Sequence, residues 1–441
     1  MIEDTLNEIF SYRTLTRREN IDDLRLVYSL LGNPCKNIKT IHIAGTNGKG
    51  STASFIENIF FAAGYNVGKF TSPHILKYNE RIVFNGEIIP DEEIIQIYNI
   101  VKDTINRYNY KTEEHKKIIS LNFFEITTFI ALLFFEKHSP DFIILETGLG
   151  GRLDATNIVN SDISIITNIS FDHTGILGNS LKEISYEKAG IIKNNQLCIY
   201  SDSLPELTEE IRKKTHCSIN VVQKYENMKI ELDKKNYKTL VELEGRHFII
   251  PLFGKFQAYN FLAAYEAAKI YNIDDITIQK GLDSVYWPAR FEIFSNDPHI
   301  ILDAAHNDNS IEKLTENLRE LYRKDEIIII TSLLSTKDFR CVFEKLEDIS
   351  DKIYVTSLKD IVYGLTSEEI REKMILSDIP IENIIFQDDI SVAFTEALNI
   401  ISNGMSSKTG RKYKAIVICG SFYEISKFRI INSNKNNSKT T

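Results

Sequence analysis

The sequence IHIAGTNGKGS, residues 41–51, decides the fold of this chain. An apolar run leads into a Gly-rich turn, Lys49 follows, and an amphipathic segment then covers residues 52–63. A strand, a glycine turn and a helix start in this order form an anion site, because backbone N–H groups and the positive helix end point at a phosphate. The strict P-loop pattern is not met, since Gly50 separates Lys49 from Ser51. Taken alone, the segment also fits a plain Gly-rich loop.

Short apolar runs alternate with helical patterns through the first two thirds of the chain. This alternation predicts a mainly parallel sheet with helices on both faces. The expected strands are residues 38–44, 141–146, 163–168 and 197–200, and the clearest expected helices are residues 124–137, 180–189 and 257–270. Residues 237–251 are typical of an antiparallel hairpin at the domain edge.

A second cycle of strands begins at residue 300. Its members are near-continuous Ile/Val runs, as expected when both faces of a sheet are covered; they are residues 300–302, 327–331, 353–356 and 415–419. The fold class is therefore α/β: a P-loop NTPase-like N-terminal domain with a mainly parallel sheet, and a smaller Rossmann-like C-terminal domain. The expected boundaries are 1–287, a proline-containing linker 288–298, a second domain 299–431, and a polar, disordered tail 432–441.

The composition of the chain limits the kinds of molecule that we expect it to bind. The net charge of -9 argues against a general nucleic-acid surface. The five cysteines are scattered without a CxxC pair, so they indicate neither a zinc ribbon nor a disulfide framework. The N-terminus is unlike a signal peptide, and the apolar runs are too short to span a bilayer. We expect a cytoplasmic monomer with small-molecule partners, no nucleic acid and no membrane.

Six further motifs follow the phosphate loop. They are TSPH at 71–74, LETGLGGRLDATN at 145–157, TNISFDHTGILGNSLKEISYEKAGIIK at 167–193, PARFE at 288–292, DAAHN at 303–307 and GSFY at 420–423. In this order and at these separations, the sequence resembles the folylpolyglutamate synthase/dihydrofolate synthase family. This family is a branch of the Mur-ligase superfamily of ATP-dependent amide-forming enzymes. The resemblance extends from about residue 12 to about residue 428.

The resemblance implies that ATP binds at the phosphate loop and at four later residues. The loop residues are Gly45, Thr46, Asn47, Gly48, Lys49, Gly50 and Ser51, and the later ones are Asn260, Arg290, Asp303 and His306. The planar fork of Arg290 suits phosphate oxygens, and Asp303 follows a strand where a carboxylate can hold a ribose hydroxyl. If both domains contact one ATP, the site is a cleft that closes.

Glu146 ends the apolar run FIILE, at the sheet edge that carries the phosphate loop. A strand-end carboxylate is either solvated or a metal ligand, and ATP phosphates come with Mg²⁺ held by hard oxygens. The resemblance assigns Glu146 to magnesium together with Ser72 and His173. Histidine is a poor magnesium ligand, so chemistry alone favours an acid–base or core role for His173.

Lys188 lies near the end of an expected helix, where a lysine is favoured by the helix dipole alone. The resemblance matches it to a lysine carbamylated by CO2. A carbamate needs the neutral amine, and burial near other cations lowers a lysine pKa enough to provide it. The catalytic residues that we expect are thus Lys49, His173 and Lys188.

Two segments are implied for the pterin substrate. They contain Asn122, Phe123, Phe124 and Glu125, and then Leu153, Asp154 and Ala155. The Phe124 ring can stack on a flat heteroaromatic ring, or can pack in the core at a helix start. Asp154 caps the following turn or accepts hydrogen bonds from pterin nitrogens; the sequence leaves both readings open.

The chain departs from the family pattern at four positions. Phe256 replaces a common His, Ala289 and Ala304 replace glycines, and Asn122 replaces Ser or Thr. All are small or apolar changes beside the functional side chains, except Asn122, which stays polar. They affect the expected detail of the adenine and pterin pockets more than the reaction.

The expected reaction is a ligation in two steps. ATP phosphorylates a substrate carboxylate, and the amine of L-glutamate attacks the acyl phosphate, with Lys49 and Mg²⁺ neutralising the developing charge. Two alternatives stay open: a Mur-type ligase acting on a cell-wall nucleotide precursor, and a P-loop NTPase that is not a ligase. The motif GLGGRLDATN and the lack of a UDP-binding domain before residue 41 argue against the first. TSPH and the Lys188 segment argue against the second.

Overall fold

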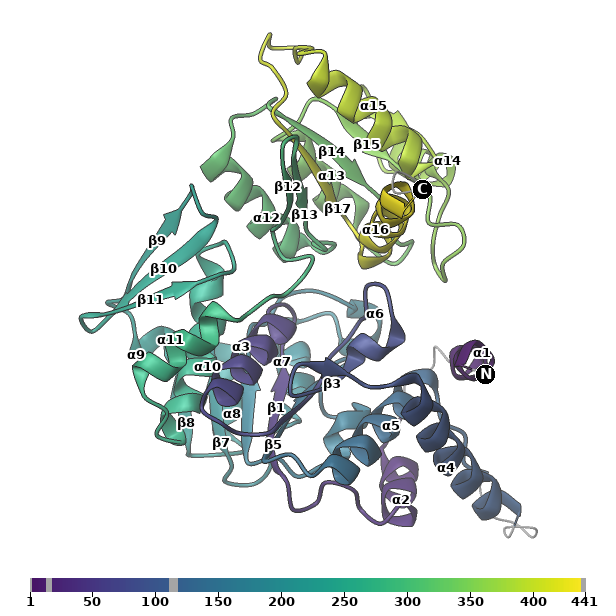
Figure 1. Cartoon of the computed structure of the whole chain (residues 1–441), viewed down its shortest axis with the longest axis vertical. Helices are drawn as coiled ribbons and strands as arrows, with labels where there is room; N and C mark the ends of the chain where they lie inside the picture. The colour runs from purple at the N-terminus through teal and green to yellow at the C-terminus, as the bar shows by residue number, and fades with distance from the viewer. Residues whose placement is uncertain (1, 13–17, 111–117, 438–441) are drawn as a thin grey trace. The chain divides into compact units, whose positions relative to one another are not determined.

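The computed structural model describes residues 2–12, 18–110 and 118–437. The chain divides into two compact units, Met1–Met228 with Tyr259–Val285, and Lys229–Ala258 with Tyr286–Thr441 (Figure 1). The second unit includes residues 229–258 as well as the chain from Tyr286 onward, and the boundary expected at residue 287 stays a prediction. The chain returns from the second unit to the first inside helix α10 (Phe256–Ile270).

The first unit is built on an eight-stranded sheet with the strand order β4-β3-β2-β5-β1-β6-β7-β8. Strands β2, β5, β1, β6, β7 and β8 run parallel to one another, whereas β3 pairs antiparallel with β2 and β4 pairs antiparallel with β3. The predicted mainly parallel sheet is confirmed. The strands are β1 (Lys39–Ala44), β2 (Val67–Phe70), β3 (Ile82–Phe84), β4 (Glu87–Ile88), β5 (Phe142–Glu146), β6 (Ile163–Ile166), β7 (Leu197–Tyr200) and β8 (Ser218–Asn220).

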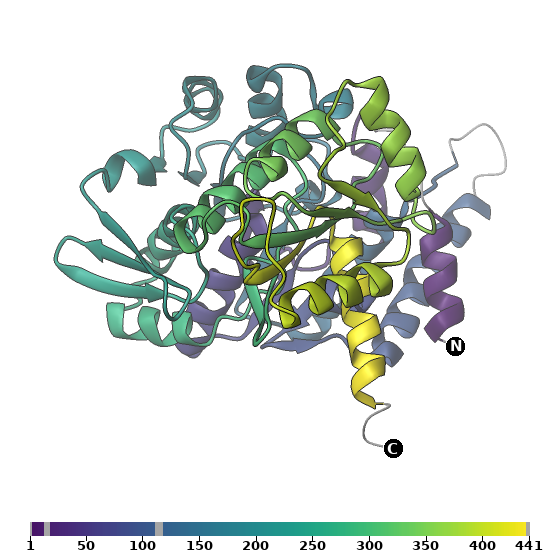
Figure 2. The ribbon, with the colours of Figure 1, turned by 90° about the horizontal axis from the view of Figure 1, so that it is seen from above.

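Helices cover both faces of this sheet, and the alternation along β5 shows which residues face which layer. Phe142 points toward α3, where its ring lies 4.8 Å from that of Phe60. Ile143 and Leu145 belong to the other core cluster, which also contains residues of α5. The ribbon of the strands and helices can be followed in Figures 1 and 2. The helices are α1 (Ile2–Ser11), α2 (Asp22–Leu30), α3 (Lys49–Ala62), α4 (Asp91–Tyr110), α5 (Phe123–His138), α6 (Thr174–Leu177), α7 (Leu181–Ala189), α8 (Pro205–Arg212), α9 (Val221–Lys224), α10 and α11 (Asp275–Asp283), with short 3₁₀ turns η1 (Tyr78–Arg81) and η2 (Ala155–Ile158).

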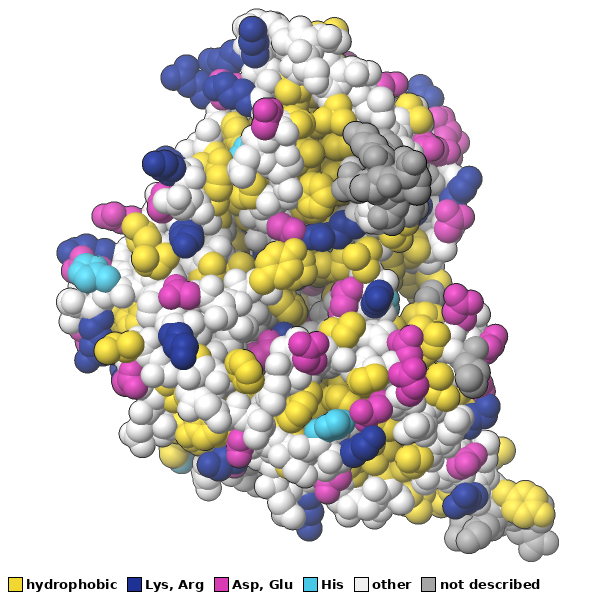
Figure 3. Space-filling view, in the orientation of Figure 1, with side chains coloured by type: hydrophobic (Ala, Val, Ile, Leu, Met, Phe, Trp, Pro, Cys, Tyr) yellow, Lys and Arg dark blue, Asp and Glu magenta, His cyan; other side chains and the backbone are white. Residues whose placement is uncertain are grey.

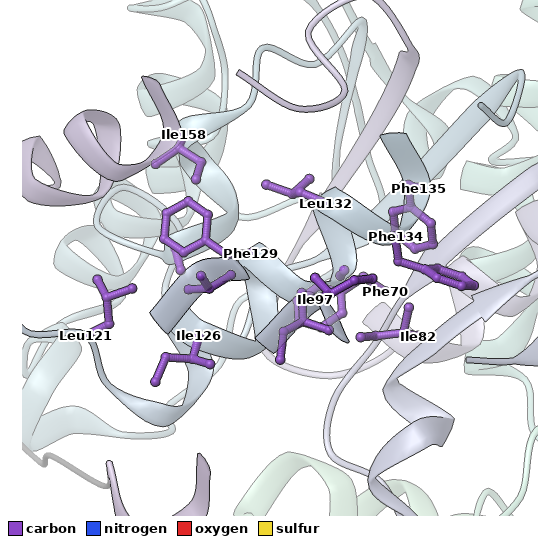
Figure 4. Close-up of a cluster of buried hydrophobic side chains, with 14 of the residues drawn as sticks. Phe70, Ile82, Ile97, Leu121, Ile126, Phe129, Leu132, Phe134, Phe135 and Ile158 are labelled. Carbon is purple, nitrogen blue, oxygen red and sulfur yellow. The ribbon is translucent and has the colours of Figure 1, made fainter. Parts of the chain in front are cut away.

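The core on the α5 face is aromatic and aliphatic throughout. Phe70 from β2, Phe129 and Phe135 from α5, and Ile97 from α4 pack together with almost no exposed surface (Figure 4). On the α3 face a buried ion pair joins Lys69 of β2 to Glu57 of α3. Burial on both faces fixes the register of the parallel strands, and so brings their carboxyl ends to one edge.

The second unit contains a six-stranded sheet and a separate three-stranded sheet. The strand orders are β12-β13-β17-β14-β15-β16 and β11-β10-β9. In the larger sheet β12 pairs antiparallel with β13, and the other strands are parallel. The strands are β9 (Lys229–Asp233), β10 (Lys238–Leu243), β11 (Arg246–Ile250), β12 (Glu292–Asn296), β13 (His299–Leu302), β14 (Ile327–Thr331), β15 (Ile353–Val355), β16 (Ile384–Phe386) and β17 (Ala415–Cys419); the helices are α12 (Asp308–Leu321), α13 (Phe339–Glu347), α14 (Ser367–Leu376), α15 (Ile390–Ser402) and α16 (Phe422–Asn437).

Three segments differ from the sequence expectation. The expected linker 288–298 contains β12, whose Glu292 is held by Arg429 of α16 at 2.5 Å. The expected hairpin gains a third strand, β9. Helix α16 continues to Asn437, within the tail expected to be disordered from residue 432, and residues 438–441 lie outside the described part. Within this part of the helix, the Asn432 side chain donates to the Phe428 carbonyl and the Ser433 hydroxyl donates to the Arg429 carbonyl.

Among the described residues, no helix combines the length and the apolar character needed to cross a bilayer. Acidic and basic side chains are interspersed over the first unit on the face shown in Figure 3. That mixture agrees with the absence of a long single-sign run in the sequence.

Candidate active site

The phosphate loop lies between β1 and α3, as predicted. Gly48 precedes α3 in the left-handed region, with φ of 85°, and a Cβ at this position would collide with the Asn260 side chain of α10. Glycine is therefore required here both by conformation and by space. The contact also brings Asn260, predicted as an ATP residue, next to the loop. The first N–H groups of α3 have no partner inside the helix, so they are available to an anion.

Two lysine amines converge on one carbonyl oxygen of this loop. Lys49 Nζ donates to Gly45 O at 3.0 Å and to Thr46 O at 3.1 Å. Lys188 Nζ donates to the same Gly45 O at 2.7 Å. Burial, and then the nearby Lys49 charge, lower the pKa of Lys188 well below its usual value, while Asp172 and Asp154 oppose this. The structure therefore places Lys188 at the phosphate loop and favours its neutral amine.

A residue outside our predicted set holds the loop in shape. Asn168, just after β6, accepts from Thr46 N through its backbone carbonyl at 2.8 Å and from Asn47 N through its side chain at 2.7 Å. The preceding Thr167 donates its hydroxyl to Asn47 O at 2.6 Å. Both residues begin the motif TNIS, at the end of the strand predicted at residues 163–168.

Glu146 and Ser72, two of the expected metal residues, are adjacent. Ser72 N donates to the buried Glu146 carboxylate at 3.0 Å, because β2 and β5 are neighbours and end at the same edge. His173 precedes α6 with φ of 51°, and its half-exposed ring lies 3.8 Å from Asp172. Among the described residues, no three His, Cys, Asp or Glu side chains gather as a metal-binding group. The metal assignments stay predictions.

The residues at this edge fit a hydrated divalent cation in their chemistry. The Ser51 hydroxyl in the first turn of α3 is buried and has no hydrogen-bond partner among the described residues. A buried hydroxyl without a partner is costly unless a ligand satisfies it. Together with the Glu146 carboxylate, it supplies the hard oxygen donors that Mg²⁺ prefers.

The first predicted pterin segment begins α5. Asn122 caps the helix by accepting from Glu125 N, and the Glu125 carboxylate accepts from Asn122 N at 2.8 Å and pairs with Arg18. Both side chains thus have structural partners. The Phe124 ring packs against Phe70, at 5.6 Å between centroids, and is only partly buried. The ring also covers Gly148 so closely that a Cβ there would collide with it.

The second predicted pterin segment is clamped to the helix that carries Lys188. Arg152 N donates to Glu187 O at 2.7 Å, and the Arg152 guanidinium bonds to the Glu187 carboxylate at 2.8 Å. A Cβ on Gly151 would strike the backbone carbonyls of residues 187 and 188. Asn157 completes the clamp by donating to the Gly190 carbonyl at 3.1 Å. This loop and Lys188 therefore form one rigid group.

Asp154, which follows Leu153 and precedes Ala155 in this loop, has a buried side chain. It caps η2, so the capping role considered from the sequence is observed. Burial raises the pKa of Asp154, and its hydrogen bonds to Thr156, Leu149 and Gly148 oppose that rise.

The predicted nucleotide residues of the second unit gather around the ends of β13 and β17. The Arg290 guanidinium lies 4.8 Å from the centre of the Phe422 ring, and the His306 ring lies 6.2 Å from it. The buried Asp303 accepts from Phe291 N and Ala305 N, each at 2.8 Å. Burial raises the pKa of Asp303, and the Arg290 charge opposes this rise.

The departures from the family pattern have local consequences. Ala289 stands at φ of 59°, a conformation that favours glycine. Its carbonyl nevertheless accepts from Ala304 N at 3.0 Å, which ties together the two segments where alanine replaces glycine. Phe256 opens α10, with its ring against Gly254.

Comparison with known proteins decides between the alternatives. Residues 94–268 match the Mur ligase middle domain, and residues 289–422 match the domain described as Mur ligase, glutamate ligase domain. The chain is 36% identical over 358 residues to dihydrofolate synthase/folylpolyglutamate synthase of Bacillus subtilis, which covers 76% of this chain and 80% of that protein. The chain belongs to the dihydrofolate synthase/folylpolyglutamate synthase family. It is 30% identical over 386 residues to the Escherichia coli member, covering 87% of this chain and 84% of that one.

Solved structures agree with this family assignment. The structure of E. coli FolC in complex with DHPP and ADP has a TM-score of 0.82 to this chain, with 27% identity and coverage of 98% of both chains. A Mycobacterium tuberculosis folylpolyglutamate synthase complexed with ADP and AMPPCP has a TM-score of 0.84 at 23% identity, and supports the fold. The predicted family, α/β fold and ATP-dependent ligase class are confirmed. The cell-wall ligase and the non-ligase NTPase are no longer needed as alternatives.

Proposed function

We propose that this chain couples ATP cleavage to the attachment of L-glutamate to dihydropteroate and to reduced folates. Relatives that are 30% identical or more are named for both activities. The observation that carries the proposal is the convergence of Lys49 and Lys188 on the Gly45 carbonyl, beside a loop clamped to the Lys188 helix. This arrangement serves a phosphoryl acceptor that binds next to ATP.

The first step transfers the γ-phosphoryl group of ATP to a substrate carboxylate. The N–H groups at the start of α3 and the Lys49 ammonium stabilise charge on the transferred group. Lys49 reaches the phosphates by leaving the loop carbonyls that it contacts at 3.0 and 3.1 Å. The L-glutamate amine then attacks the acyl carbon, and phosphate leaves as the amide bond forms.

Magnesium is the cofactor that we propose besides ATP, held by Ser51, Ser72, Glu146 and His173. When bound, Mg²⁺ supplies positive charge to the phosphates. If these residues hold it, Glu146→Ala and His173→Ala each raise the magnesium concentration required for half-maximal turnover. Unchanged magnesium titrations in both variants would remove these two residues from the metal site.

Lys188 acts in this proposal as its carbamate, formed by CO2 on the neutral amine, so that it offers an anionic oxygen group beside Lys49. The pterin lies against Phe124 and the loop that contains Leu153, Asp154 and Ala155. Phe123 and the capped start of α5, Asn122 with Glu125, support that surface. Arg290, Asp303 and His306 contribute to nucleotide binding, and a cytoplasmic monomer stays our expectation.

The test is incorporation of labelled L-glutamate onto dihydropteroate and onto tetrahydrofolate in parallel, with ADP formation measured in the same reactions. We expect one ADP per glutamate incorporated on each acceptor, and no ADP without an acceptor. Incorporation onto one acceptor only would limit the function to one of the two activities. ADP formation without incorporation would contradict the ligase function.

A further inference from the structure

The carboxylate of Asp154 is fully engaged inside its own loop. Oδ2 accepts from Gly148 N and Leu149 N, both at 2.9 Å. Oδ1 accepts from Thr156 N at 3.0 Å and from the Thr156 hydroxyl at 2.6 Å. A carboxylate offers about four acceptor positions, and these four donors fill them. Asp154 therefore holds the two ends of the loop together.

The network continues from Thr156 to a buried histidine on β1. His42 Nε2 lies 2.7 Å from the Thr156 hydroxyl oxygen, and both side chains have no exposed surface. Since the hydroxyl proton is donated to Asp154, the oxygen accepts the proton on His42 Nε2. The other ring nitrogen, Nδ1, is buried without a hydrogen-bond partner among the described residues. Burial lowers the pKa of His42 to about 3, so the ring is neutral.

This network joins the two loops that must receive the reactants. His42 lies on β1, which leads directly into the phosphate loop, and its backbone is fixed between β5 and β6 in the sheet. Asp154 shapes the loop of residues 148–154, which is clamped to the Lys188 helix. A reacting carboxylate must lie within about 3.5 Å of the phosphoryl group, so the spacing of the two loops matters to the reaction.

We propose that Thr156 and His42 are positioning residues for the pterin-bearing substrate: acting through Asp154, they hold the loop 148–154 in the shape that receives it, in register with the phosphate loop. The proposal rests on the function proposed above, because it names the part of that site which recognises the pterin. It also assigns Asp154 to the support of the loop backbone.

The decisive comparison is between Thr156→Val and Thr156→Ser. Valine keeps the shape but removes the hydroxyl, while serine keeps the hydroxyl that bridges His42 and Asp154. We expect Thr156→Val to raise the KM for dihydropteroate at least tenfold and to leave the affinity for ADP within twofold of wild type. Thr156→Ser should restore the pterin KM to within threefold of wild type.

Two results would overturn the proposal. One is a wild-type pterin KM in Thr156→Val. The other is an equal loss of pterin and ADP binding in both variants, tracking a lower melting temperature, which would mean that Thr156 only supports the fold. Direct binding of dihydropteroate to the enzyme, measured without turnover, separates these cases from a change in the chemical step.

A spectroscopic measurement keeps the proposal testable if Thr156→Val does not fold. In wild-type enzyme with ¹⁵N-labelled histidine, the His42 ring should be neutral at pH 6 and protonated on Nε2, with assignment by His42→Gln. Protonation on Nδ1 would contradict the network. If wild-type enzyme incorporates no glutamate, the proposed function fails, and the His42 spectrum still reports whether this network exists.

Discussion

At the scale of single residues, two lysines bond to the same Gly45 carbonyl but differ in burial. Lys49 is half-buried, whereas Lys188 is buried, and both amines donate to the Gly45 carbonyl. A cation at the phosphates acts mainly in the transition state. The two lysines should therefore respond differently to substitution.

Lys49→Ala is expected to lower kcat for glutamate incorporation by about 10²–10³-fold or more, because it removes the charge that stabilises the transferred phosphoryl group. The circular dichroism spectrum and melting temperature should stay close to wild type. Lys36→Ala, which removes an exposed lysine from the same unit, is the matched control and should keep full turnover. Near-normal turnover of Lys49→Ala at saturating ATP would contradict the phosphate-loop assignment.

The prediction for Lys188 follows from its lowered pKa. Its pKa is lowered by burial and by Lys49, so at fixed CO2 pressure the neutral fraction, and with it the carbamate, grows as pH rises toward and past that lowered pKa. Lys188→Ala and Lys188→Arg should both be nearly inactive, acetate should partly restore Lys188→Ala, and removal of CO2 should slow the wild-type enzyme.

Activity assays in CO2-free and bicarbonate-containing buffer, with a mass measurement of the intact protein, check this prediction. If Lys188→Arg kept substantial activity and acetate had no effect, Lys188 would act as a plain cation. Tyr186→Phe, two residues away at an exposed position of α7, keeps Lys188 and is a control that should respond to CO2 as the wild-type enzyme does.

Single-residue roles were predictable where a motif names a side chain, and less so where the backbone acts. The phosphate loop lies between β1 and α3, Asn260 lies beside it, and Ser72 N bonds to Glu146, while the roles of these residues stay predictions. Asn168 was missed because it holds the loop partly through a carbonyl, which no side-chain pattern shows. The sequence left two roles open for Asp154, a helix cap and a pterin ligand, because the hydrogen bonds that its carboxylate accepts can be counted only in the structure.

At the scale of elements, a buried carboxylate links α16 to the sheet of the second unit. Glu424 accepts from the Thr356 hydroxyl, and its other oxygen is buried without a hydrogen-bond partner among the described residues. Burial raises the pKa of Glu424 to about 7, against the opposing effects of Thr356 and Lys427. The fold thus prefers the protonated acid.

The sign of the resulting pH dependence follows from linkage. Because the folded pKa lies above the unfolded value near 4.5, the contribution to stability is complete below about pH 4.5 and is lost as pH rises through about 7. The loss amounts to about 3 kcal/mol, at about 1.4 kcal/mol for each pKa unit. Glu424→Gln should remove this dependence, and so be more stable than wild type at pH 8 and similar at pH 5.

Urea unfolding at pH 5 and pH 8 measures the difference directly. Glu372→Gln, which neutralises an exposed carboxylate on α14 of the same unit, should leave the pH dependence of wild type unchanged. If Glu424→Gln showed the wild-type dependence, the Glu424 carboxyl would titrate normally in the folded state.

Elements with a long apolar run were predicted almost to the residue, and elements stabilised by distant partners were not. Strands β1, β5, β6 and β7 consist of residues buried on both faces, so their hydrophobic pattern is self-sufficient. The edge strand β12 is mostly half-exposed and depends on pairing with β13 and on the Arg429–Glu292 bond.

At the scale of the whole molecule, the two units have separate cores, and the expected nucleotide residues are divided between them. The phosphate loop and Asn260 belong to the first unit, and Arg290, Asp303 and His306 to the second. The expectation of a second domain rests on the restart of the strand pattern near residue 300. The sequence did not predict that residues 229–258 join the second unit, because that assignment depends on tertiary packing.

Asp303 gives the sharpest test of whether one nucleotide uses both units. Backbone N–H groups of Phe291 and Ala305 fill two of its acceptor positions, so lone pairs remain for a ligand, in contrast to Asp154. Asp303→Asn retains part of the backbone support but loses the charge and one acceptor oxygen. We expect it to weaken ADP binding about tenfold, measured by calorimetry, with Asp378→Asn on the exposed surface of the same unit as the control. Because the phosphate loop is intact in this variant, a loss of affinity with an unchanged melting temperature means that the second unit holds part of the nucleotide. Wild-type ADP affinity in Asp303→Asn would confine nucleotide binding to the first unit and leave the motif DAAHN without its expected role.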